Sequence, residues 1–208
     1  MKRKTEILVF AAVLFLGIFL RIYRLGEIPY GLSQDETSLG YNSYSILKTY
    51  KDEYGKFLPQ NFKAFGEYKL PGYIYSSIIP ISLFGLTPFS IRLTSAISGI
   101  IQIILIYLIT KLLLQFTESK NLPKIKLLKF YPLLTALLAT INPWSLHYSR
   151  AAFEVNLANF FVLFGVYLFL KSIISNKAQL IYLSIILFSL SLYTYNMQNY
   201  LLLCFSFS

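Results

Sequence analysis

Charged residues are scarce in this sequence. Asp, Glu, Lys and Arg make up 13% of the 208 residues, whereas 56% are hydrophobic and 17% are aromatic. The mean hydropathy of +0.58 lies outside the range of soluble domains. This sparse charge excludes a soluble protein and indicates an integral membrane protein.

Cysteine and histidine occur once each. The single Cys204 excludes an intramolecular disulfide, and its position in an apolar run is typical of a thiol that packs as a small hydrophobic group. The single His147 has no partner at a metal-ligand spacing, so we expect an interfacial histidine and no zinc site built on histidines. Internal repeats and low-complexity tracts are also missing, which excludes solenoid and disordered chains.

Long apolar runs are what the sequence has instead. The first follows Lys2, Arg3 and Lys4, and no small-x-small cleavage site comes after it. We therefore expect an uncleaved first helix with its amino terminus inside, lengthened by Arg21 and Arg24, which can snorkel to the interface.

The composition predicts an all-α, polytopic transmembrane protein that forms one domain over 1–208, in which a long outer first loop contains interfacial helices. The expected helices cover about 7–25, 92–114, 130–147, 154–171 and 178–196, and the outer loop covers about 26–91. The chain ends about nine residues into a new apolar segment, which is too short to span a bilayer. We therefore expect an amino-terminal part of a longer protein.

The topology depends on residues 72–86, an apolar stretch with Pro80 near its middle that is shorter than a span. If this stretch crossed the membrane, the lysine-rich loop at 115–129 would face outward, against the positive-inside rule. If it lies in the outer interface, ten basic residues face inward against two acidic ones, and seven of the nine acids face outward. We expect the second arrangement.

The outer loop has a helix signal of its own. Ser33 and Glu36 have the spacing of a capping box, and Leu39, Ser43 and Ile46 follow with helical periodicity. This pattern predicts a helix that lies along the outer surface. A loop of more than 60 residues is far longer than a simple connection, and such loops usually carry function.

Two acids and a lysine in this loop are candidate functional residues. Glu36 is explained equally well as the reciprocal member of the capping box. Asp35 is harder to explain by capping, and an acid near an apolar interface is a candidate for a raised pKa. Lys69 is either a headgroup anchor or a cation that holds a phosphate, and Arg92 has the same two alternatives.

A second set of candidates begins at Asn142 and Pro143, which break the third apolar helix. Arg150 and Glu154 follow at i, i+4, and they form either an interfacial ion pair or part of a polar site. Glu154 opens an apolar helix, where an unneeded carboxylate is costly. The stretch "YTYNMQNY" at 193–200 is either an aromatic belt or a set of groups that hydrogen-bond a sugar.

These stretches, in this order, resemble the amino-terminal half of a C-type glycosyltransferase of the family 39-like group, which includes protein O-mannosyltransferases and lipid A aminoarabinose transferases. The resemblance extends over nearly the whole chain. It is carried by "QDE", "FGEYKLPGYIYSSIIPISLFGLTPFSIRLTSAISG", "NPWSLHYSRAAFEVNLANFF" and "YTYNMQNY".

The resemblance implies an inverting enzyme that moves a sugar from a polyprenyl-phosphate donor to a hydroxyl of a protein, lipid or glycan on the outer face of the plasma membrane. It implies that Asp35, with Glu36, is the general base and that Glu154 is the acid of the second outer loop. It assigns the donor phosphate to Lys69, and we add Arg92 and Arg150 to that group.

The sequence departs from this family at several positions. Tyr68 separates Glu67 from Lys69, which puts a metal role for Glu67 in doubt, and the residues require no divalent metal cofactor. Arginines that some relatives have after the Asp-Glu pair and in the tyrosine-rich stretch are replaced by the residues Thr37, Ser38, Gln198 and Asn199.

The interpretation favoured by the sequence is thus a membrane glycosyltransferase that contacts membrane lipids and no nucleic acid. The alternatives are a transporter or another non-catalytic membrane protein, or an inactive fragment. A transporter is expected to place ionisable residues near mid-bilayer in broken helices. Here the central regions hold little beyond Gln102.

Overall fold

The computed structural model describes residues 3–119 and 126–195. Over this part the regular secondary structure is helical apart from one short hairpin, and the predicted all-α, polytopic membrane class is confirmed. The elements are α1 Arg3–Ile22, α2 Gln34–Thr49, β1 Phe62–Ala64, β2 Glu67–Lys69, α3 Pro71–Phe84, α4 Pro88–Ser119, the 3-10 helix η1 Lys126–Phe130, α5 Tyr131–Ile141, α6 Pro143–Arg150, α7 Glu154–Ser175 and α8 Ala178–Leu192.

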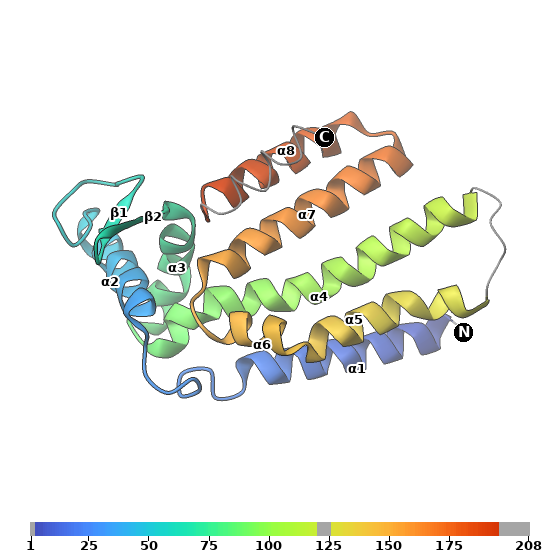
Figure 1. Ribbon diagram of the computed structural model, residues 1–208, viewed down its shortest axis with the longest axis horizontal. Coiled ribbons are helices and arrows are strands. Elements are labelled where there is room, and N and C mark those ends of the chain that lie inside the picture. The colour runs from blue at the N-terminus through green and yellow to red at the C-terminus, as the bar shows by residue number, and fades with distance from the viewer. Residues whose placement is uncertain (1–2, 120–125, 196–208) are drawn as a thin grey trace.

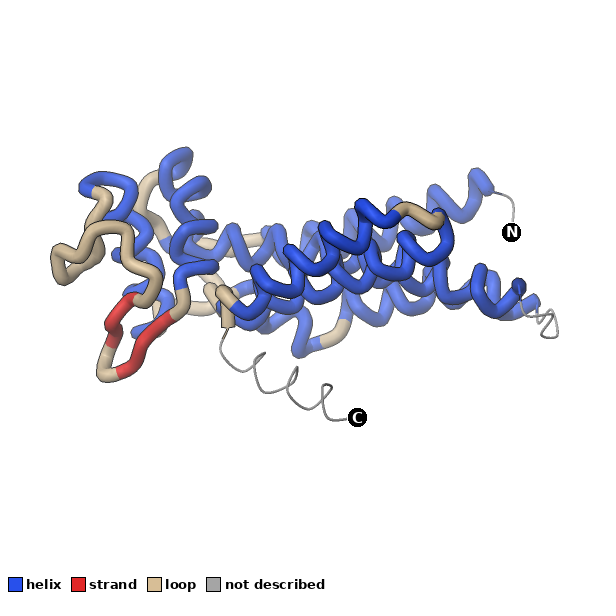
Figure 2. The backbone as a smooth tube through the Cα atoms, turned by 90° about the horizontal axis from the view of Figure 1, so that it is seen from above, coloured by secondary structure: helices blue, strands red, loops and turns tan. Residues whose placement is uncertain are grey.

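The long helices α1, α4, α5, α7 and α8 run alongside one another, and α2, α3 and the hairpin gather at one end of them (Figures 1 and 2). Helices long and apolar enough to cross a membrane cover Lys4–Ile22, Pro88–Phe116 and Glu154–Ser175, and shorter apolar helices cover Leu128–Ile141 and Ala178–Leu192. The chain is therefore an integral, multi-pass membrane protein.

The short helix α3 has 14 residues, with Pro80 inside it, which is fewer than the ~20 that span a bilayer. Figure 1 shows α3 lying across the end of α4 rather than along it. Two contacts hold it there: Tyr73 donates a hydrogen bond to the carbonyl of Ile91 at 2.9 Å, and Ser43 of α2 donates to the carbonyl of Ile74 at 2.9 Å.

The predicted capping box at the start of α2 is confirmed. The Ser33 hydroxyl accepts from the backbone N–H of Glu36, and the Glu36 carboxylate accepts from the backbone N–H of Ser33. The buried face of α2 then packs on α3 in a core that also takes in the hairpin and the starts of α4 and α7. This core consists of Leu39, Ile46, Phe62, Tyr73, Ile74, Ile81, Ile91, Ala152 and Leu157.

The predicted helix at 130–147 is divided in two, because Pro143 has no backbone N–H to continue α5. α5 ends at Ile141, and Asn142 then caps α6 by accepting from the backbone N–H of Trp144 at 2.9 Å. The sequence placed a break at Asn142 and Pro143, and the structure confirms it. The predicted range 92–114 lies inside α4, which is longer at both ends.

Arg21 occupies this break. The expectation that Arg21 snorkels to the interface is wrong, since its side chain is fully buried between α1, α5 and α6. It donates to the carbonyls of Ala139 at 3.2 Å and Thr140 at 3.3 Å. In a continuous helix, the carbonyl of Ala139 would accept a hydrogen bond from the backbone N–H of residue 143. Pro143 has no such N–H group. Arg21 therefore satisfies carbonyls that the break leaves open.

Candidate functional site

Lys69 lies at the end of the β1–β2 hairpin, two residues before the start of α3. The hairpin turns through Phe65 and Gly66, and both have positive φ, as a tight two-residue turn requires. Phe62 pairs with Lys69 across the hairpin and is fully buried in the core. The buried phenylalanine fixes the strand, and the strand fixes the lysine.

The Lys69 ammonium joins two of the predicted acids. It lies 2.7 Å from Oδ1 of Asp35, at the start of α2, and 3.7 Å from Oε1 of Glu154, at the start of α7. The lysine and glutamate side chains are 9% and 17% exposed, whereas the aspartate is 65% exposed. Three predicted site residues from distant parts of the chain thus meet in one cluster.

A pocket of about 190 Å³ opens beside this cluster. It is lined by Glu67, Tyr68, Lys69, Leu70, Glu154, Thr194 and Tyr195. Thr194 and Tyr195 belong to the candidate stretch at 193–200, whose residues 196–200 lie outside the described part of the chain. Leu70 was not a candidate, and its only signal in the sequence is its place between Lys69 and the start of α3.

The far wall of the pocket depends on a close approach at Gly72. Its backbone N–H donates to the carbonyl of Tyr193 at 3.1 Å. A Cβ added at Gly72 would lie 2.9 Å from the Cα of Thr194, closer than backbone atoms can tolerate. The glycine therefore lets the start of α3 meet the end of α8, which brings Thr194 and Tyr195 to the pocket.

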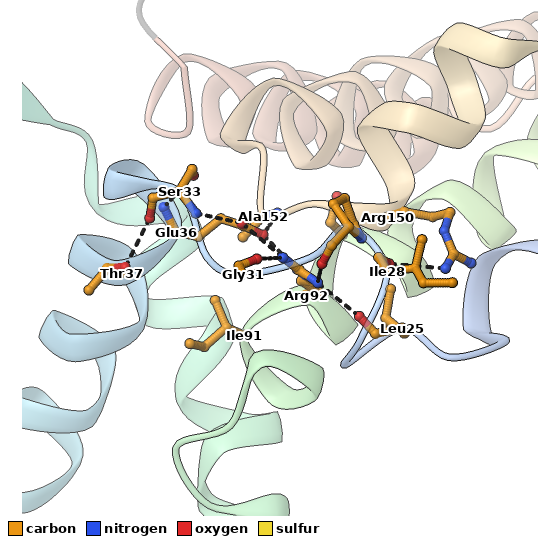
Figure 3. Close-up of polar contacts among 12 residues, drawn as sticks. Leu25, Ile28, Gly31, Ser33, Glu36, Thr37, Ile91, Arg92, Arg150 and Ala152 are labelled. Atoms are coloured by element: carbon orange, nitrogen blue, oxygen red, sulfur yellow. Dashed lines mark hydrogen bonds and ion pairs between the residues drawn. The ribbon is translucent and has the colours of Figure 1, made fainter.

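Glu36 and Arg92 belong to a separate, buried ion pair (Figure 3). Nε of Arg92 donates to Oε1 of Glu36 at 2.8 Å, and Oε1 also accepts from the backbone N–H of Ala152 at 3.0 Å. Burial alone would raise the pKa of the Glu36 carboxyl. The hydrogen bonds from Arg92 and from the N–H groups of Ser33 and Ala152 outweigh burial and hold that pKa below its usual value.

The Arg92 guanidinium has no N–H group left for a ligand. Besides Glu36, it donates to the carbonyls of Leu25, Pro29 and Gly31 in the connection between α1 and α2. These bonds engage all five donors of the side chain. The structure therefore does not bring Arg92 to the pocket as a phosphate-binding group, and it holds Glu36 by its cap and ion pair.

Arg150 is held in a similar way. It donates to the carbonyls of Leu20 and Tyr23 at the end of α1, and to that of Ile28 (Figure 3). Burial and the nearby charge of Arg92 lower its pKa. Within the described residues no ion pair joins Arg150 to Glu154, because α6 ends at the first and α7 begins at the second. Of the two alternatives for Arg150 and Glu154, the i, i+4 ion pair is therefore wrong.

No group of three or more His, Cys, Asp or Glu residues in 3–119 and 126–195 could hold a metal ion. His147 contacts the rings of Tyr148 and Phe153. The pocket therefore offers carboxylates, an ammonium and tyrosines, without the ligand geometry of a metal centre.

One family model matches the chain: residues 90–157 are similar to the serpentine type 7TM GPCR chemoreceptor Srv. The matched stretch includes most of α4, all of α5 and α6, and the first residues of α7, among them Glu154. No curated protein and no solved structure matches the chain.

This match contradicts the glycosyltransferase resemblance, since chemoreceptors are membrane receptors and not enzymes. The predictions of an enzyme, of sugar transfer, of a polyprenyl-phosphate donor and of an acceptor hydroxyl are therefore wrong. The described parts of the quoted stretches contain the starts of helices α2, α3, α6 and α7, and a shared helix pattern does not fix the function of a membrane protein.

Proposed function

We propose that this protein is a non-catalytic membrane receptor that binds a small ligand in the pocket around Lys69. The observation that carries the proposal is the pocket itself, where an almost fully buried lysine is held by two acids beside a cavity. A cavity with a few convergent polar groups is the usual form of a ligand site. The match to a chemoreceptor family over 90–157 supports this function.

The cluster has a form suited to signalling. Asp35, Lys69 and Glu154 come from α2, β2 and α7, and the pocket is also lined by the residues that follow α8. A ligand that binds beside Lys69 therefore acts on the ends of several helices at once. Differential contacts of this kind are what a ligand needs in order to shift a membrane protein between two states.

We further propose that the pocket faces outward and the amino terminus faces the cytoplasm. α1 begins at the end of the helix bundle opposite to α2 and α3 (Figure 1). Lys129 lies in the last turn of η1, Lys171 lies near the end of α7, and Lys177 directly precedes α8. The positive-inside rule places such lysines in the cytoplasm. The acidic pocket then opens on the outer side.

Ligand binding can be tested by the thermal stability of the purified protein. The test compounds are small amines, alcohols and carboxylates built on one benzyl scaffold, and the variants are Tyr195→Ala, which removes a pocket ring, and Tyr193→Ala. Tyr193 is exposed and does not line the pocket. We expect at least one class to raise the melting temperature of wild type and of Tyr193→Ala, but not of Tyr195→Ala.

Mass spectrometry of the recovered compound should find it unchanged, as expected of a receptor. The proposal fails if no class stabilises the wild type, if Tyr195→Ala responds like wild type, or if the bound compound is converted.

A further inference from the structure

The pocket has an excess of negative charge. Glu67 and Lys69 are two residues apart on β2 and therefore share one face of the strand. With Asp35 and Glu154, they place three carboxylates against one ammonium. Among the described residues, the ion pairs of Lys69 involve Asp35 and Glu154, and Glu67 forms none.

The single ammonium is also unequally shared. Lys69 lies 2.7 Å from Asp35, which is a full hydrogen bond, but 3.7 Å from Glu154. The charge of Asp35 is thus compensated most directly. Glu67 and Glu154, which both line the pocket, keep most of their capacity to accept hydrogen bonds from a bound group.

The remaining lining adds to this preference. Tyr68 and Tyr195 line the same pocket, with Leu70 between the charged strand and α3. Aromatic faces attract cations and have no such attraction for anions. Carboxylates and tyrosines around one small cavity form a set of groups that recognises an organic ammonium.

We propose that the pocket binds a small organic cation, whose ammonium group lies between the carboxylates of Glu67 and Glu154 while Lys69 stays paired with Asp35. This inference rests on the receptor function proposed above and names the chemical class of its ligand. The ammonium can belong to a soluble amine or to the ethanolamine headgroup of a lipid, because both present the same group.

The test is a titration of the purified full chain with benzylamine, benzyl alcohol and benzoate, which share a ring and differ in charge. We expect benzylamine to bind the most tightly. Glu67→Gln should weaken it by about ten-fold, the loss of one charged hydrogen bond. Glu27→Gln removes an exposed acid outside this pocket and should leave the affinity unchanged.

Lys69→Ala decides between a cation and an anion, because the two alternatives predict different changes in the affinities for benzylamine and benzoate. Removing the ammonium makes the pocket more acidic and leaves space beside Asp35 and Glu154 for the amine. Benzylamine should therefore bind Lys69→Ala more tightly than wild type. If Lys69 instead holds an anion, the variant loses benzoate binding and gains nothing for benzylamine.

The outcomes separate the two proposals. Preferred binding of benzoate or benzyl alcohol that depends on Tyr195 overturns the cation and keeps the receptor, whereas no binding of any compound overturns both. The lipid arm repeats the titration in bilayer discs of phosphatidylglycerol with and without phosphatidylethanolamine. If phosphatidylethanolamine weakens the binding of benzylamine, its headgroup is the source of the ammonium. If benzylamine binds with equal affinity in the two kinds of disc, the ligand is a soluble amine.

Discussion

Asp35 and Glu36 are sequence neighbours with opposite surroundings. Glu36 is buried in an ion pair with Arg92, and Asp35 is mostly exposed and faces Lys69. The capping box was predictable because it is a local pattern of four residues. The pair with Arg92 was not, since it joins residues 56 positions apart and depends on how α4 packs against α2.

Glu36→Gln should lower the free energy of unfolding by about 3 kcal/mol, because removing one partner leaves a buried, uncompensated charge. The measurement is thermal or chemical unfolding in detergent, with Glu27→Gln as the control. Glu27 pairs with Arg24, and both side chains are largely exposed, so this control should unfold like wild type. Equal free energies of unfolding for Glu36→Gln and Glu27→Gln would contradict a stabilising role for the buried pair of Glu36 and Arg92.

The same pair predicts how stability depends on pH. The pKa of Glu36 in the folded protein lies below the usual value of 4.5, so the unfolded chain takes up the proton first as the pH falls. The stabilisation is therefore complete above about pH 4.5 and is lost as the pH falls through the lower, folded-state pKa. The melting temperature of wild type should fall over this range more steeply than that of Glu36→Gln.

The cluster at Lys69 was predictable only in part. The sequence identified Asp35, Lys69 and Glu154 because charged groups beside apolar segments are conspicuous. It left open whether Glu154 pairs with Arg150 or belongs to a polar site, and the structure pairs Glu154 with Lys69. The helix end that separates Arg150 from Glu154 was not visible in the periodicity of the sequence.

At the scale of elements, the helix break at Asn142 explains where Arg21 lies. A proline inside an apolar helix was a sufficient signal for the break. The arginine that satisfies the open carbonyls comes from α1, which is distant in the chain, so its role required the structure. The hairpin was missed as well, because strands of three residues are too short for a visible alternation.

Arg21→Met should destabilise the protein by about 1–3 kcal/mol, since the carbonyls of Ala139 and Thr140 lose a buried donor. Trp144, the single tryptophan, is the second residue of α6, just after the break, and its fluorescence reports on the local change. Arg24→Met is the matched control, because Arg24 is exposed and bonds Glu27. We expect a lower melting temperature and altered emission for Arg21→Met alone. Wild-type values for that variant would disprove the capping role.

At the scale of the whole molecule, composition was a reliable guide and family resemblance was not. Scarce charge and long apolar runs are direct requirements of a bilayer, so they predicted the helical membrane class. The acidic and aromatic stretches contain the starts of helices, and a receptor and an enzyme can share such a pattern. The function therefore has to be argued from the pocket and tested by binding.

The most direct measurement is the labelling of Tyr68→Cys by a membrane-impermeant maleimide in intact cells, in a Cys204→Ser background. Tyr68 is 65% exposed and lines the pocket. Lys129→Cys, an exposed position in the last turn of η1, is the control. We predict that Tyr68→Cys reacts from outside, that benzylamine slows the reaction, and that Lys129→Cys reacts only after permeabilisation. Labelling of Tyr68→Cys only after permeabilisation, or at a rate that none of the benzyl compounds changes, would contradict an outward-facing ligand pocket.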